Sequence, residues 1–249
     1  EKTVKVKNLS TGEEFEESYD KLILSPGAKP VKPSMTGVDT DRVFTLRTVE
    51  DTFRIHKFIA ENDVKSAVIA GGGYIGLEMA ENLTEKGIRV TIVQRPNQVM
   101  APLDYDMACQ LHGLLRKKGI TLKFGSSVTG FEEKDSLILT TLKDDEPLKS
   151  DLVILAIGVT PDTALAKDAG LALGIKGSIA VNERMETSAA DVYAVGDAVQ
   201  VKNFVTGEDA LISLAGPANK QGRIAADNIC GLKSSYDGSQ GSSVIKIFD

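Results

Sequence analysis

The stretch from Ser66 to Gln94 constrains the fold of this chain more than any other part of the sequence. Its first run, AVIAGG, predicts a short buried strand, IGLEMAENLTEKG predicts an amphipathic helix that ends at a glycine, and RVTIVQ predicts a second apolar strand. A strand, a helix and a strand in this order form a βαβ unit, in which the two strands run parallel. We therefore expect an α/β fold built on a parallel sheet.

The turn between the first strand and the helix reads GGGYIG over residues 71–76, which fits the spacing G-x-G-x-x-G. In such a turn Gly71 permits a tight bend, Gly73 lets the backbone approach a diphosphate, and Gly76 lets the helix pack closely on the sheet. A glycine-rich turn without a ligand is the alternative, but the complete βαβ context favours a dinucleotide site. The residues expected to form this part of it are Gly71, Gly73, Tyr74, Ile75 and Gly76.

No acidic residue stands where a dinucleotide fold often has one, roughly 20 residues past the first glycine at the end of the second strand. Gln94 occupies that place and Arg95 follows it. A carboxylate would accept a hydrogen bond from the 2′-hydroxyl of NAD, whereas an amide beside a guanidinium tolerates or binds the 2′-phosphate of NADP. The pair favours NADPH, and Arg95 as an ordinary solvated charge is the equally weighted alternative.

Beyond this unit the pattern predicts one further helix and then a series of short strands. The helix covers about Asp104 to Lys118, and its apolar stripe consists of Met107, Leu111, Leu114 and Leu115. From Thr121 to Ile157, short apolar runs alternate with charged turns and end in the continuous run LVILAIG. This predicts an antiparallel meander that leads into a buried strand.

The two ends of the chain carry shorter signals. The N-terminal run predicts two strands joined by a turn at Thr11-Gly12. After residue 160 we expect a short helix near 163–169, a second meander, a strand at VYAVGD, and a helix from about Pro217 to Ile229. The last run, SSYDGSQGSSVIKIFD, predicts a polar linker followed by one strand. Since the chain does not begin with Met, we expect it to be an internal piece of a longer protein.

The composition excludes several classes of protein. The 29 basic and 35 acidic side chains give a net charge of −6, so the chain lacks the basic face that a nucleic acid requires. No run approaches the roughly 18 apolar residues of a membrane helix. Two cysteines and two histidines are too few for a structural zinc site or a disulfide framework, which favours a reducing, cytoplasmic setting and no metal.

We expect no catalytic nucleophile among these residues. Cys109 falls beside the apolar stripe of one predicted helix and Cys230 at the end of another, so neither position indicates the accessible, electropositive site that a reactive thiol needs. His56 and His112 have no matched partner in the sequence.

Three further segments carry a resemblance to a known family. YDKLILSPGAKP (residues 19–30), LAIGVTPD (155–162) and ETSAADVYAVGDA (186–198) resemble, in this order around the glycine-rich turn, the pyridine nucleotide-disulfide oxidoreductases. The third is the most specific, because it matches the family's second flavin motif, in which the aspartate at Asp197 binds the ribityl chain of FAD. A fourth segment, residues 211–229, is similar to the branch of coenzyme A-disulfide reductases, NADH oxidases and polysulfide or persulfide reductases.

The resemblance implies roles for particular residues. Tyr74 would act as a gate beside the nicotinamide, Glu78 would lie near its carboxamide, and Gly158 would let the ring approach closely. The start of the helix at Pro217 would face the flavin and stabilise the negative charge of its reduced form. The positions that would contribute to FAD binding are Ser25, Pro26, Gly27, Gly196, Asp197, Ala215 and Pro217.

The implied fold is a Rossmann-like NAD(P)-binding domain with three layers, helices, sheet and meander, flanked by remnants of a second, FAD-binding Rossmann-like domain. We expect residues 1–36 and 170–237 to be the two FAD-domain parts and 37–169 to be the NAD(P)H-binding domain. Residues 238–249 would be a linker and the start of a missing dimerisation domain, so the parent protein would be a homodimer. Only one G-x-G-x-x-G is present, so the flavin's ADP cradle and the redox cysteine would lie elsewhere.

The implied activity is transfer of hydride from NAD(P)H to FAD, for the reduction of a disulfide, a persulfide or polysulfide, or oxygen. By itself the chain would bind FAD weakly or not at all and would be inactive. The sequence leaves the electron acceptor open. A non-catalytic NAD(P)-binding module that reports nucleotide state to a partner is the alternative.

Overall fold

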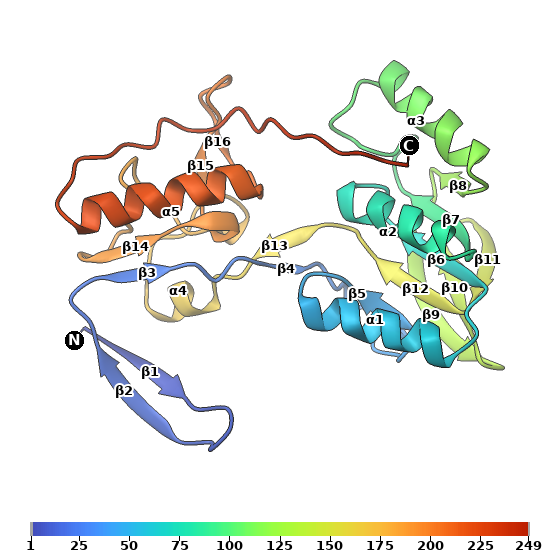
Figure 1. The fold of residues 1–249 in the computed structure, drawn as a ribbon, viewed down its shortest axis with the longest axis horizontal. Helices are drawn as coiled ribbons and strands as arrows, with labels where there is room; N and C mark the ends of the chain where they lie inside the picture. Colours follow the sequence, from blue (N-terminus) through green and yellow to red (C-terminus); the bar gives the residue numbers. More distant parts are fainter. Residues whose placement is uncertain (1, 249) are drawn as a thin grey trace. The chain divides into compact units, whose positions relative to one another are not determined.

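The computed structural model describes residues 2–248 and divides the chain into two compact units (Figure 1). Unit 2 comprises Lys29–Val159 with the described residues from Ile245 onward, and unit 1 comprises the residues before Lys29 together with Thr160–Val244. The chain passes between the units within two short strands, β4 (Ala28–Pro30) and β13 (Val159–Pro161), and again between Val244 and Ile245. These unit boundaries lie at residues 28–29 and 159–160, whereas the predicted domain boundaries are at residues 36 and 169.

Unit 2 is built on a five-stranded sheet with the order β5-β12-β6-β7-β8. Every neighbouring pair in this sheet is parallel, as the βαβ pattern predicted. Helix α2 (Tyr74–Glu85) connects β6 to β7, and Gly87 follows it with a left-handed φ of 78°. The strands are β5 (Val43–Thr45), β6 (Ser66–Ala70), β7 (Arg89–Gln94), β8 (Thr121–Phe124) and β12 (Leu152–Leu155).

The expected meander is real but shorter than predicted. Three antiparallel strands form a separate sheet, in the order β11-β10-β9. Thr121–Phe124 is not part of it, because β8 follows helix α3 (Tyr105–Lys117) and pairs in parallel with β7 as a second βαβ crossover. The meander strands are β9 (Val128–Lys134), β10 (Leu137–Leu142) and β11 (Asp145–Ser150).

Helix α1 (Val49–Glu61) has no counterpart in the sequence prediction. Its N-terminus is closed by a capping box, in which Oγ1 of Thr48 accepts from the N–H of Asp51 and the Asp51 carboxylate accepts from the N–H of Thr48. The pattern Thr-x-x-Asp before Phe53 and Ile55 is the signal that could have found this helix.

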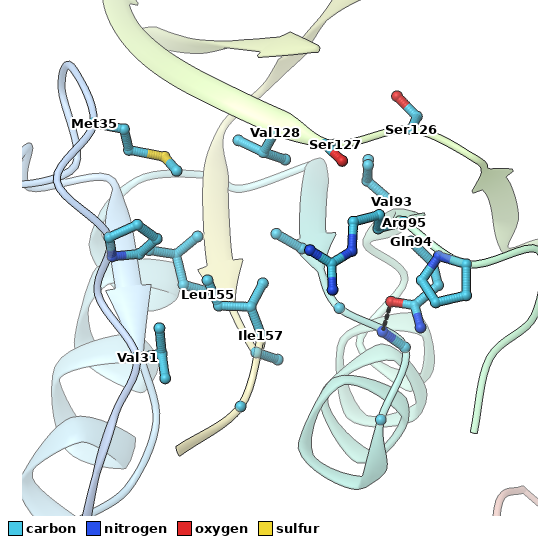
Figure 2. A pocket seen from close by; sticks show the side chains of 18 residues that line it. Val31, Met35, Val93, Gln94, Arg95, Ser126, Ser127, Val128, Leu155 and Ile157 are labelled. Carbon is cyan, nitrogen blue, oxygen red and sulfur yellow. Dashed lines mark hydrogen bonds between the residues drawn. The ribbon is translucent and has the colours of Figure 1, made fainter. Parts of the chain in front are cut away.

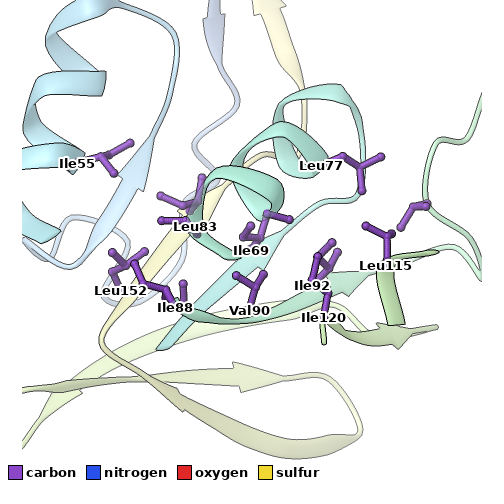
Figure 3. Packing of buried hydrophobic residues seen from close by; sticks show 14 of the residues in the cluster. Ile55, Ile69, Leu77, Leu83, Ile88, Val90, Ile92, Leu115, Ile120 and Leu152 are labelled. Carbon is purple, nitrogen blue, oxygen red and sulfur yellow. The ribbon is translucent and has the colours of Figure 1, made fainter. Parts of the chain in front are cut away.

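The residues of the parallel sheet alternate between two cores, which gives unit 2 its three layers. Ile69, Ile92 and Ile154 face the helices and pack with Leu77 and Leu83 of α2, as Figure 3 shows for most of this cluster. Val68, Val93 and Val153 point to the opposite face and pack against the meander. A sheet covered on both faces needs apolar residues at successive positions, and this explains the unbroken runs AVIA and LVIL. The three-layer α/β prediction is confirmed.

The buried face of α3 matches the predicted apolar stripe in part, since Leu115 is buried and Leu111 packs against the core, whereas Met107 is exposed. Ala108, His112 and Leu115 are buried, whereas the side chain of Met107 is 58% exposed. The prediction followed the largest apolar residues, but a histidine takes a place on the buried face of the helix.

Unit 1 contains a two-stranded parallel pair, β3 (Leu22–Leu24) with β14 (Val192–Ala194). The hairpin predicted around Thr11-Gly12 is present as β1 (Thr3–Lys7) and β2 (Glu14–Ser18). Further elements of unit 1 are α4 (Ala164–Asp168), β15 (Val201–Lys202), β16 (Asp209–Ala210) and α5 (Ala215–Ile229).

Two predictions for the second half of the chain were wrong in detail, whereas the helix near Pro217 is present. The second meander is reduced to isolated bridges, such as Leu173 with Ile179. Helix α5 begins at Ala215, two residues before the expected start, and Pro217 lies in its first turn as expected. No strand forms over the described residues of VIKIFD, although Phe248 is buried in the helix-side core of unit 2.

Asp191 connects β3 to β14 at the start of the parallel pair. Its carbonyl accepts from the N–H of Leu22, and its carboxylate pairs with the ammonium groups of Lys2 and Lys21. Hydrogen bonds from these two lysines lower the pKa of Asp191 to about 2.

Among the described residues, no helix has the length and apolar character needed to cross a membrane.

Candidate functional site

A cavity of about 590 Å³ lies in unit 2, at the carboxyl ends of its central strands (Figure 2). The chain leaves β6 toward β7 on one side, while β12 pairs with β6 on the other side. The edge beside β6 is therefore the switch point of the sheet, where α/β folds bind their ligands. The cavity is lined by Val31, Pro33, Met35, Ala70, Gly71, Gly72, Gly73, Val93, Gln94, Arg95, Pro96, Ser126, Ser127, Val128, Leu155, Ala156, Ile157 and Gly158.

The three motif glycines differ in what surrounds them. A Cβ added to Gly71, whose φ is 109°, would lie 2.2 Å from the carbonyl oxygen of Ala156. A Cβ on Gly76 would lie 2.0 Å from the carbonyl oxygen of Gly71. A Cβ on Gly73 would meet no atom within 4 Å, although Gly73 lines the cavity. Gly71 and Gly76 are thus required by the fold, whereas the space at Gly73 is open.

Gly73 is also the N-cap residue of α2, and no side chain caps this end of the helix. The backbone amides of a first helical turn have no intrahelical acceptors and attract anions. The open space at Gly73 and the uncapped helix end therefore fit a diphosphate, and any side chain at this position would take up part of its room.

The side chain of Gln94 is engaged with the glycine-rich turn. Its Oε1 accepts from the N–H of Gly72 (N···O 3.0 Å; dashed line in Figure 2), and its Nε2 donates to the carbonyl of Gln98 (3.2 Å). The amide is therefore held by the protein backbone. Arg95, next in the chain, is exposed and reaches into the cavity.

The cavity brings together part of the predicted nucleotide site. The predicted residues in its lining are Gly71, Gly73, Gln94, Arg95 and Gly158. Four others lie along the first turns of α2 outside this lining, namely Tyr74, Ile75, Gly76 and Glu78. Tyr74 is half-buried against the helix-side core, and Glu78 is exposed. Their roles toward a nicotinamide stay predictions.

Two segments of the cavity wall were missed by sequence reasoning. Ser126–Val128 follow β8, and assigning that strand to the meander hid the fact that it ends at the same edge as β6 and β7. Val31, Pro33 and Met35 follow β4 and were counted with the other domain, and no motif in the sequence marked them.

The predicted flavin residues of unit 1 come from neighbouring strand ends. Leu24 of β3 pairs with Ala194 of β14, so Ser25–Gly27 and Gly196–Asp197 leave the same edge of a parallel pair. Carboxyl ends of parallel strands are where α/β folds hold their ligands. Ala215 and Pro217 lie in the first turn of α5, which no side chain caps.

Gln221 of α5 is a residue of this region that sequence reasoning missed. Its side chain is 2% exposed, and its Oε1 accepts from the N–H of Gly196 at 2.7 Å. Gly196 has a left-handed φ of 82°, so its amide is turned out of the strand ladder and needs another acceptor. A polar residue on the buried face of a predicted helix is the signal that could have found it.

The structure corrects one expectation about the cysteines and adds one contact of a histidine. Cys109 and Cys230 are both exposed, so the expectation that neither is accessible was wrong. His112 accepts a hydrogen bond at Nε2 from the backbone N–H of Val99, a contact that the sequence did not indicate. Among the described residues, no group of three or more His, Cys, Asp or Glu side chains could hold a metal ion.

The fold and the two candidate sites have the arrangement that the sequence motifs predicted for an α/β protein with a nucleotide site. The chain belongs to the pyridine nucleotide-disulphide oxidoreductase family, whose model matches residues 1–222. This confirms the resemblance that the segments around the glycine-rich turn indicated.

Individual relatives lie in the expected branch of this family. The chain is 40% identical to an NADH oxidase of Methanocaldococcus jannaschii, covering 96% of this chain and 53% of the relative. It is 34% identical to a coenzyme A disulfide reductase of Staphylococcus haemolyticus, covering 100% and 55%. The crystal structure of reduced Bacillus anthracis CoADR-RHD matches with a TM-score of 0.96 and 48% identity, covering 99% of this chain and 44% of that one. The chain spans about half the length of the curated relatives it matches.

Replacing Gln221 with Met tests the link between α5 and the Gly196 turn. The substitution keeps the volume but leaves the N–H of Gly196 without its acceptor, so we expect the free energy of unfolding to fall by about 1–3 kcal/mol. Urea denaturation measures this change. Asn219→Ala, on the exposed side of the same helix, is the control and should change it much less. Equal stability of the Gln221→Met and wild-type proteins would contradict the assignment.

Proposed function

We propose that this chain supplies the NAD(P)H-binding domain and part of the FAD site of a flavin-dependent oxidoreductase. The enzyme would pass hydride from NAD(P)H to FAD and then reduce a disulfide, a persulfide or polysulfide, or oxygen. For a disulfide, NAD(P)H and one proton would yield NAD(P)⁺ and two thiols. Unit 2 would be the NAD(P)H-binding domain, and unit 1 would be the part of the FAD domain that this chain carries. The acceptor is left open.

One observation carries the proposal. In the glycine-rich turn, the positions of Gly71 and Gly76 are filled by neighbouring backbone, while the position of Gly73 opens on the cavity at the N-terminus of α2. Packing alone explains the first two glycines. The third is explained by a group that comes close to the backbone at a positive helix end, and a diphosphate is such a group.

The chain's own residues would position the two cofactors. Gly73 and the end of α2 would bind the diphosphate, Arg95 would contact the adenosine ribose or its 2′-phosphate, and Gly158 would leave room for the nicotinamide. Tyr74 would gate that ring and Glu78 would lie near its carboxamide. When bound, the pyridine nucleotide supplies the hydride and the flavin accepts it.

Unit 1 would hold the flavin through its strand ends and through α5. Asp197 would bind the ribityl chain and Ser25–Gly27 would contact the cofactor beside it. The first turn of α5, with Ala215 and Pro217, would stabilise negative charge on the reduced flavin by its helix dipole. The match to relatives named NADH oxidase and coenzyme A disulfide reductase supports this division of labour. A cytoplasmic homodimer is part of the same proposal.

A measurement of bound flavin separates this proposal from a non-catalytic nucleotide sensor. The whole protein, purified without added cofactor or reconstituted with FAD, should show flavin absorbance that NADH or NADPH bleaches. A sensor has no use for the carboxylate of Asp197 or for the helix end at Pro217. A whole protein that stays colourless after reconstitution would contradict the oxidoreductase assignment.

The glycine-rich turn gives a second test, because alanine at two of its glycines should have different effects, one on nucleotide binding and the other on stability. Gly73→Ala places a methyl group in open space, so the free energy of unfolding should change by less than about 1 kcal/mol. The Kd for NAD⁺ should rise by about tenfold or more, because the methyl group takes the diphosphate's room. Gly76→Ala should instead destabilise the fold by about 2 kcal/mol or more, because it overlaps the Gly71 carbonyl.

Calorimetric titration and urea denaturation measure the two effects separately. Gly113→Ala on α3 is the control, since its added methyl group also meets no atom within 4 Å and lies away from the cavity. It should leave the Kd unchanged. Unaltered NAD⁺ binding by a folded Gly73→Ala protein would contradict a diphosphate at this position.

Arg95→Glu tests the preference between the two coenzymes. If the guanidinium meets the 2′-phosphate, the substitution should weaken binding of NADP⁺ relative to NAD⁺ by about 1–3 kcal/mol, roughly five- to 150-fold. Arg89→Glu, at the opposite end of β7, should leave the ratio of the two Kd values unchanged. The same ratio in the Arg95→Glu and wild-type proteins would remove Arg95 from the phosphate site.

A further inference from the structure

A short segment that follows β7 contacts the glycine-rich turn and fixes its backbone. We define residues 98–100 as the strap. The N–H of Met100 donates to the carbonyl of Gly72 at 2.7 Å. The side chain of Val99 lies so close to Gly72 that a Cβ there would be 2.7 Å from Val99 Cγ1. The contact with Val99 and the hydrogen bond from Met100 together fix the backbone of Gly72. Gly72 is the residue before Gly73, where the diphosphate is proposed to bind.

The strap does not hold this conformation by local preference. Met100 has a left-handed φ of 48°, which costs an L-residue free energy and persists only when its surroundings enforce it. Val99 and Met100 are both buried, and the backbone amide of Val99 therefore needs an acceptor inside the protein. His112 supplies that acceptor.

The imidazole of His112 is 4% exposed, and its Nε2 accepts from the N–H of Val99 at 3.2 Å. His112 does not line the cavity, so it acts on the turn only through the strap. Its ring packs between two aromatic rings, Phe124 of β8 at 4.7 Å and Tyr105 of α3 at 6.4 Å between centroids. The hydrogen bond requires a free lone pair on Nε2, which only the neutral imidazole offers.

The surroundings of His112 favour that neutral form. Burial lowers the pKa of His112 below its ordinary value, and the positive charge of Arg116, one turn along α3, lowers this pKa further. The groups that face the ring from β8 and from the strap are the phenyl ring of Phe124 and the backbone of Val99, and from α3 the phenol of Tyr105 and the guanidinium of Arg116.

We propose that His112 is a positioning residue for nucleotide binding: by accepting from the Val99 amide it holds the strap, and the strap holds the glycine-rich turn in its diphosphate-binding shape. This inference rests on the proposed function of that turn. Protonation of His112 would place a second N–H opposite the Val99 amide, break the hydrogen bond and release the strap.

The direction of the pH effect follows from the lowered pKa. Since protonation of His112 is harder in the native, strapped state than in a state without the strap, that native state loses stability as pH falls below about 6.5, the ordinary histidine value. NAD⁺ binds the strapped state, so its Kd should rise over the same range. At pH 7.5, above both pKa values, His112 is neutral and can accept from the Val99 amide.

The test compares the Kd for NAD⁺ at pH 7.5 and 5.5 by calorimetry on the whole protein. NAD⁺ is the probe because the 2′-phosphate of NADP⁺ itself titrates near a pKa of about 6. His112→Gln keeps an acceptor without a titrating proton, and His112→Phe keeps the ring without an acceptor. His56→Gln is the matched control, since His56 is the other histidine of the chain and is exposed on α1.

We expect the wild-type and His56→Gln proteins to bind NAD⁺ about threefold or more weakly at pH 5.5 than at pH 7.5. His112→Gln should bind as wild type at pH 7.5 and keep that Kd at pH 5.5. His112→Phe, if folded by circular dichroism, should bind several-fold more weakly at both values. A role in folding alone would lower stability without flattening the pH profile of binding.

Two results would overturn the inference while leaving the proposed function intact. One is NAD⁺ binding by the wild-type protein that does not change between pH 7.5 and 5.5. The other is a His112→Gln protein with the wild-type pH dependence. Failure of the folded wild-type protein to bind either coenzyme at any pH would instead overturn the proposed function together with the inference.

Discussion

The close approach of helix α2 to the turn before it is the constraint on which the proposed nucleotide site depends. An added methyl group at Gly76 would come within 2.0 Å of the Gly71 carbonyl, and one at Gly71 within 2.2 Å of the Ala156 carbonyl. Only glycine allows these three backbone segments to meet. The approach brings the N-terminus of α2 to the carboxyl edge of the sheet, beside a cavity of about 590 Å³. The open space at Gly73 lies at the helix end only because Gly71 and Gly76 pack closely against neighbouring backbone.

Sequence reasoning worked where a residue type has one physical explanation. The runs AVIA and LVIL predicted buried parallel strands, and the spacing of Gly71, Gly73 and Gly76 predicted the turn between β6 and α2. It failed where the same residues suit two arrangements. Thr121–Phe124 reads equally well as a meander strand or as a parallel one, and only its pairing with β7 decides between them. That choice also concealed Ser126–Val128 in the cavity wall.

Polar residues on buried helix faces were the other source of error. The apolar stripe of α3 selected Met107, which is exposed, and passed over His112, which is buried. A histidine or glutamine is buried when a tertiary partner satisfies it, and such a partner cannot be read from spacing along the helix. Val99 lies 13 positions before His112 and Gly196 lies 25 before Gln221, so neither hydrogen bond leaves a local pattern in the sequence.

Gln94 and Gln221 show the same physical solution in the two units. At the end of a parallel strand, a glycine turn leaves the hydrogen-bond ladder of the sheet. The backbone amide of the glycine then lacks the acceptor that the next strand would have supplied. Glycine has no side chain that could replace this acceptor. In unit 2 the acceptor for Gly72 is Gln94, and in unit 1 the acceptor for Gly196 is Gln221. A glutamine oxygen accepts such a hydrogen bond without adding a negative charge, which in unit 2 would lie beside the proposed diphosphate position. The glutamine at position 94, where many dinucleotide folds have an acidic residue, is therefore explained by its hydrogen bond to Gly72 as well as by the choice of coenzyme.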